Sequence, residues 1–481
     1  MTEVLRTTIP ARLDRLPWTR FHTLVTAVLG ITWILDGLEV TIVGALGPSL
    51  QSRATLALST PQVGAAASFY LAGAIVGALA FGWVTDRFGR RLVVFGTLAV
   101  YVAGCIGTAF SFDFASFVIF RLITGLGIGG EYAAINSTID ELTPARYRGR
   151  VALMVNGSFW IGAAAGAAAS SLLLDPRLLA PNIGWRLAFG IGGGLAGGVL
   201  LLRRFVPESP RWLITHGRAE AAEAVMRRIE TDAGVEPGPT SGDAEIALAT
   251  RETFGFAAVA TALGRRHRTR ALLVLGLMAA QAFLYNALFF TYGIVLTRFE
   301  GVAPAKVGLF LLPLAVGNFL GPLLLGPLFD TLGRKPMIAG TYGLSGLLMA
   351  ATALAFAAGW LDARTQTLCW MAIFFFASAA ASAAYLSASE LFPLEVRALA
   401  IALFYAVGTL IGGLAGPIIF AGLIASGEPG RLAWGYGAAA AVMAAAALAQ
   451  GRFGVAAEGR ALEDVAPPLS LAMPGRLEPW S

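Results

Sequence analysis

Two carboxylates stand in the middle of an apolar stretch, WILDGLEVTIVG, which covers residues 33–44. Asp36 and Glu39 are three residues apart, so on a helix they share one face. Arg121 lies in a second apolar stretch further along the chain. An isolated acid or arginine inside a bilayer is costly, but the two can pair, and such a pair can hold or release a proton.

The composition places these groups in a membrane. The chain has 481 residues, of which 57% are hydrophobic and 13% charged, and its mean hydropathy is +0.71. Apolar runs of about 20 residues recur along it, which is the length that crosses a bilayer. The runs lack a period of two, so we expect helices. The twelve predicted spans are 21–46, 64–84, 92–111, 115–138, 151–174, 187–205, 271–295, 307–329, 337–358, 366–388, 398–425 and 431–451.

A polar stretch divides these spans into six and six. If the N-terminus is cytoplasmic, 27 of the 35 Lys and Arg residues lie in cytoplasmic segments, 7 lie outside and Arg121 is intramembrane. The net charge of +6 therefore reports orientation by the positive-inside rule, and no nucleic-acid partner is expected. We predict a multi-pass protein of the cell membrane, with both termini cytoplasmic. Its predicted parts are an N-terminal segment (1–20), a six-helix bundle (21–205), a linker containing an amphipathic helix (206–270), a second bundle (271–451) and a polar, disordered tail (452–481).

Two short charged motifs occur in both halves. GWVTDRFGRR (82–91) matches GPLFDTLGRK (326–335), and ELTPARYR (141–148) matches ELFPLEVR (390–397). The repeats imply two pseudo-symmetric six-helix bundles around a central cavity. Gly, Arg and Pro would serve in tight turns, but acids paired with arginines favour a gate that locks and releases helix ends. The residues assigned to it are Gly82, Asp86, Arg87, Gly89, Arg90, Glu141, Arg148, Asp330, Gly333, Arg334, Glu390 and Arg397.

These motifs resemble those of the major facilitator superfamily, and the resemblance covers nearly the whole chain. RLITGLGIGGEYAAINSTIDELTPARYRG (121–149), PESPRWL (207–213) and SELFPLEVRA (389–398) are similar to motifs of its sugar-porter branch. The resemblance implies an all-α major facilitator fold and transport by alternating access. It also adds Glu208 and Arg211 to the gating residues.

The segment GLGIGG (125–130) also satisfies the dinucleotide-binding pattern G-x-G-x-x-G. That fingerprint needs a preceding strand and a soluble βαβ unit, whereas this copy lies inside an apolar helix. We expect its small residues to let neighbouring helices approach closely.

The depths of the intramembrane charges suggest how they pair. At 1.5 Å per residue, Glu39 and Arg121 each lie about 10 Å below the outer ends of their helices, Asp36 about 15 Å and Glu131 about 25 Å. Glu39 and Arg121 can therefore form a static ion pair or a proton-coupling pair, and Asp36 and Glu131 are the other predicted proton-coupling residues. No histidine competes, because His22, His216 and His267 lie in or beside cytoplasmic segments.

The same resemblance bears on the coupling acid. Sugar/proton symporters carry an acid in the first helix that pairs with the fourth-helix arginine, and GLE (37–39) aligns with that motif one residue out of its usual spacing. WILDGLEV is more similar to the pattern of nicotinate and synaptic-vesicle-type relatives, and aromatic-acid/proton symporters have a comparable D-G-x-D.

The residues at sugar-contact positions match that branch only in part. Gln281 and Asn286 are kept, Asn156 stands for a glutamine and Tyr385 for a tryptophan. These four are the predicted substrate-binding residues, although the two amides would also serve in helix packing. We predict a proton-coupled symporter of a small organic acid, in which protonated Glu39 frees Arg121 to bind the anion. A sugar or polyol symporter and a non-transporting receptor remain alternatives. We expect a monomer with no enzymatic activity, cofactor or metal; its partners are a small-molecule substrate, protons and the bilayer.

Overall fold

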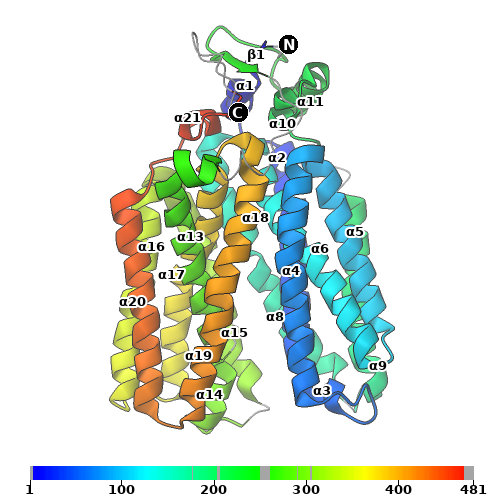
Figure 1. Ribbon diagram of the computed structural model, residues 1–481, viewed down its shortest axis with the longest axis vertical. Helices are drawn as coiled ribbons and strands as arrows, with labels where there is room; N and C mark the ends of the chain where they lie inside the picture. The colour runs from blue at the N-terminus through cyan, green and yellow to red at the C-terminus, as the bar shows by residue number, and fades with distance from the viewer. Residues whose placement is uncertain are drawn as a thin grey trace.

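The computed structural model describes residues 4–175, 177–202, 206–249, 261–289, 291–303 and 306–470. Twelve of its helical segments are long and apolar enough to cross a membrane. Figure 1 shows them as two bundles standing side by side, the first half of the chain in one and the second half in the other. The predicted fold class, an all-α membrane protein of two six-helix bundles, is confirmed.

Each predicted span coincides with a helix or a helix pair. Several ends differ by a few residues because caps, rather than hydropathy, fix them: Asp113 and Asp362 each accept the backbone N–H three residues on. The first bundle contains α2 (Arg20–Ala45), α4 (Thr60–Phe88), α5 (Arg90–Ala109), α6 (Phe114–Leu142), α7 (Arg148–Gly157) with α8 (Phe159–Leu173), and α9 (Pro181–Leu202). The second contains α13 (Arg268–Leu284) with a π-helix (Tyr285–Phe289) and α14 (Tyr292–Arg298), α15 (Val307–Thr331), α16 (Arg334–Ala357), α17 (Ala363–Glu390), α18 (Arg397–Gly408) with a π-helix (Thr409–Gly413) and α19 (Leu414–Ala425), and α20 (Pro429–Phe453).

The N-terminal segment, the linker and the tail gather at one end of the bundles, at the top of Figure 1. We call this the terminal end and the opposite one the far end, where α3 (Gly47–Gln51) lies. The predicted linker helix is present as α11 (Ala219–Asp232). The other short elements here are α1 (Ile9–Arg15), α10 (Pro210–Thr215), α21 (Leu462–Val465) and the antiparallel strands β1 (Val4–Thr7) and β2 (Ile246–Ala249).

The expectation of a disordered tail is wrong for residues 452–470. This part contains α21, and the carboxylate of Glu395 accepts hydrogen bonds from the backbone N–H groups of Leu469 and Ser470 at 3.1 and 3.0 Å. Two of its acids, Glu458 and Glu463, bind groups of the terminal end, whereas Arg452, Arg460 and Asp464 are exposed. Residues 471–481 lie outside the described residues.

Glycines of α6 allow its neighbours to pack directly against its backbone. A Cβ at Gly125 or Gly129 would overlap the carbonyl oxygen of Tyr70 or Ala74 in α4, and one at Gly127 would meet the backbone of α5. Lipid provides no hydrophobic drive between helices, so close backbone contact carries much of their association. The GLGIGG segment therefore has the packing role predicted from its sequence.

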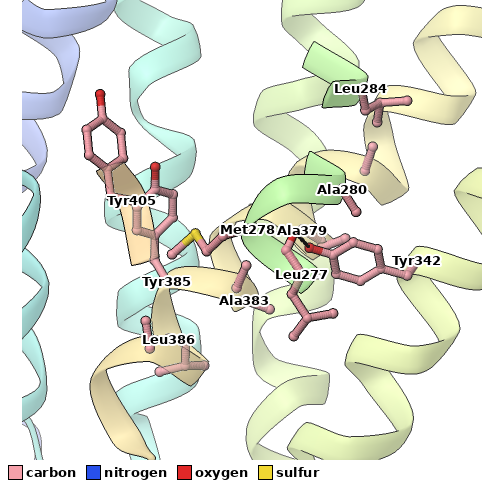
Figure 2. Packing of buried hydrophobic residues seen from close by; sticks show 14 of the residues in the cluster. Leu277, Met278, Ala280, Leu284, Tyr342, Ala379, Ala383, Tyr385, Leu386 and Tyr405 are labelled. Carbon is pink, nitrogen blue, oxygen red and sulfur yellow. Dashed lines mark hydrogen bonds between the residues drawn. The ribbon is translucent and has the colours of Figure 1, made fainter. Parts of the chain in front are cut away.

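Small residues also allow helices to pack closely in the second bundle. Figure 2 shows Ala379 and Ala383 of α17 beside α13, where the hydroxyl of Tyr342 donates to the carbonyl of Leu277 at 2.8 Å. Tyr385 and Tyr405 stand together at one side of this core in the same view. Their rings are 6.5 Å apart, and both approach Tyr132 of the first bundle. This core therefore holds two tyrosines at the interface between the halves.

The α4–α6 contact gives a first prediction. Gly129→Ala should destabilise the purified protein by about 1–3 kcal/mol, because the new methyl group must push two backbones apart. Gly194→Ala in α9 is the matched control, since nothing lies within 4 Å of the position of its Cβ. Thermal unfolding in detergent would measure both variants. Equal melting temperatures for Gly129→Ala and the control would contradict the packing role.

Candidate functional site

A cavity of about 630 Å³ lies between the two bundles. Ser171, near the end of α8, and Val307, the first residue of α15, belong to its lining, so it extends toward the far end. None of its described lining residues is charged. We call this space the central cavity. Its lining residues are Trp33, Val40, Thr41, Tyr132, Asn156, Phe159, Trp160, Ala163, Ala164, Ala167, Ser170, Ser171, Gln281, Tyr285, Gly293, Val307, Gly308, Leu311, Leu312, Ala315, Ser378, Ala381, Ser382 and Tyr385.

Aromatic rings from both bundles form much of the wall. The ring of Tyr132 is 4.5 Å from that of Trp33, nearly perpendicular to it, and 5.7 Å from that of Tyr385. A second contact between the bundles joins Trp160 and Tyr285, whose rings stack at 5.7 Å. Such walls favour a flat apolar ligand body, with specificity left to a few polar groups.

Three of the four predicted substrate-binding residues line this cavity: Asn156, Gln281 and Tyr385. The amide nitrogen of Asn156 donates to Asn136 Oδ1 at 3.1 Å and to the carbonyl of Ala152 at 2.8 Å. Its own Oδ1 has no hydrogen-bond partner within the described chain and is buried rather than open to the cavity.

Asn286 is not part of the lining, so its predicted position is wrong. Gln281 and Tyr285 both line the cavity, whereas Asn286, the second residue of the π-helix that begins at Tyr285, does not. Its amide donates to the carbonyl of Ala282 at 2.8 Å. The space beside it belongs to Gly413, where an added Cβ would lie 3.4 Å from the amide nitrogen. These contacts favour the packing role that the sequence left open for Asn286.

Glu39 and Arg121 form the ion pair that their depths predicted. Arg121 Nη2 donates to Glu39 Oε1 at 2.6 Å, and the side chains are 1% and 3% exposed, respectively. The guanidinium also lies over the rings of Tyr70 and Phe189, at 5.1 and 4.9 Å. We call Glu39 and Arg121 the buried pair. Neither partner lines the central cavity, although Val40, the next residue of α2, does.

Asp36 and Glu131, the other predicted proton-coupling residues, are also buried, with 2% and 1% exposure. The one ion pair of Arg121 in the described chain is with Glu39. The structure thus joins two of the four predicted groups directly.

At the terminal end, an aspartate from each half binds a helix N-terminus of the other half. Asp86 accepts hydrogen bonds from the N–H groups of Ala398 and Leu399 at 3.2 and 2.9 Å, at the start of α18. Asp330 accepts from the N–H groups of Gly149 and Arg150 at 2.9 and 3.0 Å, at the start of α7. A carboxylate there satisfies free N–H groups and complements the helix dipole.

Two glutamates complete this arrangement, each between two arginines. Glu141 binds Arg90 of its own half at 2.8 Å and Arg397 of the other half at 3.6 Å. Glu390 binds Arg334 of its own half at 3.0 Å and Arg148 of the other half at 3.5 Å. We call these six residues with Asp86 and Asp330 the gate network. The network ties the two bundles together at the terminal end.

Glu208 supports the network from outside. Its carboxylate accepts the N–H groups of Arg90 and Arg91 at 2.8 and 3.2 Å, beside Gly89, whose φ is 101°. Burial raises the pKa of Glu208, which these N–H groups oppose. An added Cβ at Gly89 would overlap this carboxylate, so glycine is required there on two grounds.

The sequence analysis missed the counterpart of Glu208 in the second half. Glu458 accepts the N–H of Arg334 at 3.0 Å, beside Gly333, whose φ is 109°. The surrounding AAEGRALEDV (456–465) does not repeat PESPRWL, so only the symmetry of the halves was available as a signal.

The remaining gating residues have different positions. Arg211 pairs with Asp14 at 3.0 Å and with Glu463 at 2.5 Å, which joins the N-terminal segment to the tail. Gly82 packs against Ala402, where a Cβ would lie 2.6 Å from that methyl group. Arg87 is exposed and lies over the Trp83 ring of its own helix at 5.2 Å, so it does not join the gate network.

Comparison with known proteins agrees with this architecture. The family model described as "Sugar (and other) transporter" matches residues 42–467. The niacin transporter NiaP of Acinetobacter baylyi is 28% identical over 85% of this chain and 89% of its own length. The 4-hydroxybenzoate transporter PcaK of the same organism is 30% identical over 46% of this chain and 47% of its own. Among solved structures, the proton:xylose symporter XylE bound to 6-bromo-6-deoxy-D-glucose has a TM-score of 0.74 at 22% identity, covering 92% of this chain and 98% of that one.

The gate network gives the second prediction. Asp86→Asn and Asp330→Asn should each shift the terminal end toward opening about ten- to a hundredfold, because a charge-assisted hydrogen bond is worth about 1.5–3 kcal/mol. Spin labels at the exposed positions Arg91 and Leu332, one in each half, would report the separation of the bundles. Asp232→Asn on the exposed face of α11 is the control. Distance distributions that match the parent protein in both variants would rule out the gating role.

Proposed function

Because the chain belongs to the sugar (and other) transporter family of the major facilitator superfamily, we propose that it is a proton-coupled symporter of a small aromatic monocarboxylate. The observation that carries the proposal is the buried pair of Glu39 and Arg121 beside a cavity walled by aromatic rings. The relatives named for niacin and for 4-hydroxybenzoate transport support this substrate class.

In this proposal the bundles 21–205 and 271–451 rock against each other around the central cavity. The terminal end faces the cytoplasm, together with segments 1–20, 206–270 and 452–481, and the protein works as a monomer. The positive-inside distribution of arginine supports that orientation. The gate network holds the cytoplasmic side closed while the cavity extends toward the outside.

Glu39 is the proposed proton carrier. A carboxylate enclosed in protein is costly to keep charged, and the adjacent Arg121 offsets that cost only while the two remain in contact. Two histidines outside the spans, His216 and His267, are poor candidates for the proton carrier, because burial lowers the pKa of each to about 4. Both are therefore neutral at physiological pH.

The geometry changes the expected route from proton to substrate. Arg121 is enclosed by Tyr70 and Phe189 and is absent from the cavity wall, so we no longer expect it to bind the substrate directly. Protonation of Glu39 would instead weaken the hold of α6 on α2. Helix α2 also carries Trp33 and Val40 in the cavity wall, so its movement would alter the binding site.

Charge also favours a monocarboxylate. Protonation of Glu39 adds one positive charge near a cavity without charged lining residues among those described, while the other buried acids, Asp36 and Glu131, keep their state. A substrate with a single negative charge would balance it, whereas a dicarboxylate would leave an unpaired charge in a medium of low dielectric. The ring would stack on the aromatic walls, and amides and hydroxyls would bind the carboxylate.

A sugar or polyol is the second candidate. Asn156, Gln281, Ser378 and Ser382 line the cavity and supply the neutral donors and acceptors that hydroxyl-rich ligands need. A receptor that binds such ligands without moving them is a third candidate, from a different class of protein. Uptake into proteoliposomes separates it from both transporters.

The third prediction tests the substrate class. Asn156→Ala and Gln281→Ala should weaken nicotinate binding about tenfold each, since each removes a neutral hydrogen-bond partner from the wall. Asn286→Ala is the matched control, because its amide bonds within its own helix and lies outside the lining. Titration calorimetry with nicotinate, 4-hydroxybenzoate and xylose would compare the variants. Binding of xylose alone would favour the sugar alternative.

The fourth prediction tests proton coupling. Glu39→Gln should abolish accumulation of labelled nicotinate driven by a pH gradient but spare its exchange, because exchange needs only reorientation of the loaded carrier. Asp36→Asn shows which of the two neighbouring acids couples the proton. If Asp36 is the coupling site, Asp36→Asn will exchange nicotinate without accumulating it, and Glu39→Gln will not show this behaviour. Arg121→Ala should impair both assays, since it leaves a buried acid without its partner, at a cost of about 3–5 kcal/mol. Normal gradient-driven accumulation in both acid variants would mean that the buried pair is only structural.

A further inference from the structure

Asp140 is a buried acid that the gate network does not use. It precedes Glu141 at the end of α6 and is 1% exposed. The repeat of the motif places Ser389 at the equivalent position of the second half, where SELFP (389–393) matches DELTP (140–144). The two halves therefore differ here by one ionisable group.

Neither carboxylate oxygen of Asp140 accepts a hydrogen bond within the described chain. The hydroxyl of Ser389 lies beside the carboxylate but donates to the carbonyl of Leu386 at 3.0 Å. A buried carboxylate that has lost its hydration, with one nearby hydroxyl that donates elsewhere, is costly to keep charged.

The charged groups that act on Asp140 come from three neighbouring helices: Glu390 of α17, Arg148 of α7 and Arg397 of α18. Glu390 is a like charge from the opposite half. The two arginines are engaged elsewhere, because Arg148 pairs with Glu390 and with Asp14 at 3.4 Å, and Arg397 pairs with Glu141.

On the other helices packed against α6, the described arginines are either paired or exposed, as Arg87 on α4 and Arg91 on α5 are. On α4 and α5, Asp86 lies 3.3 Å from Arg90, which also binds Glu141. On α2, Glu39 pairs with Arg121, which is about 28 Å away along α6 at 1.5 Å per residue.

A charge balance of the gate network points the same way. Its arginines are Arg90, Arg148, Arg334 and Arg397, and its acids are Asp86, Glu141, Asp330 and Glu390. The two sets are equal in number and related by the repeat. Arg150 also binds Asp330, at 3.1 Å, whereas Asp140 forms no ion pair with any of these arginines in the described chain.

We propose that Asp140 is a second proton-binding site, which holds a proton while the terminal end is closed and loses it when that end opens to water. Opening separates the halves and lets water reach the carboxylate of Asp140. The charged form of Asp140 is therefore stable in the open state and unstable in the closed state. This proton differs from that of Glu39. It is taken up from and returned to the same side of the membrane, and it does not cross with the substrate.

The proposal predicts in which direction pH changes the ratio of open to closed protein. The closed state binds one proton more than the open state, so a lower pH at the terminal end favours closure and a higher pH favours opening. For one proton, the ratio of open to closed protein changes at most about tenfold per pH unit. An acidified cytoplasm would thereby hold the carrier closed on that side.

The test uses the spin labels at Arg91 and Leu332 in the full-length protein carrying Cys105→Ser and Cys369→Ser. The protein is reconstituted in nanodiscs without substrate. The parent protein should shift toward longer distances as the pH rises from about 5 to about 8. An asparagine at this position cannot ionise. Asp140→Asn should therefore lose the pH-dependent shift in distance, and its terminal end should stay closed at a pH of about 8. Asp232→Asn on α11 should behave as the parent does.

Asp140→Ser, which copies the second half, is the companion variant if Asp140→Asn folds poorly, and it should also lose the component. A pH dependence that is unchanged in both variants would overturn the proposal. The measurement needs no substrate, and Glu39 remains intact in every variant. A negative result would therefore leave the proposed transport function untouched, and a wrong substrate would leave this test intact.

Discussion

The cost of removing charge from water governs this protein. Within the described chain, Glu39 and Arg121 are almost completely buried and neutralise each other at 2.6 Å. In the gate network each glutamate binds an arginine of its own half and a second arginine of the other half, so the second of these contacts lasts only while the halves touch. One physical constraint thus produces a stable pair inside one bundle and a breakable set of pairs between bundles.

The location of each pair determines what breaking it can do. In the proposed mechanism, loss of the contact between Glu39 and Arg121 would loosen α2 from α6 within one bundle and change the cavity wall. Loss of the bonds from Asp86 and Asp330 frees the N-termini of α18 and α7 and lets the bundles part. Because both events are electrostatic, protons and helix motion can be coupled without any large change in the apolar packing.

Much of the fold was predictable because bilayer thickness fixes the length of an apolar run and the repeated motifs fix the symmetry. Glu39 and Arg121 were paired from depth alone, since the rise of a helix converts sequence position into distance. Rotation about the helix axis was harder, and this is why Asn286 was placed in the cavity although it faces Gly413. The aromatic walls and the role of Glu458 were missed, since apolar helices contain many aromatic residues and the region around Glu458 has lost the motif.

The neutrality of the cavity fits a shared proton cycle. An anion entering a site without charged lining residues among those described would find little direct attraction, and its charge would be balanced only if Glu39 were protonated at the same time. Proton and anion would then depend on each other through Arg121, at a distance and without contact. Such a carrier avoids moving either alone, because each singly loaded form leaves a net charge in a medium of low dielectric. Coupling of this kind needs no binding residue shared by the two ligands, which explains how the acid and the cavity can occupy separate places on α2.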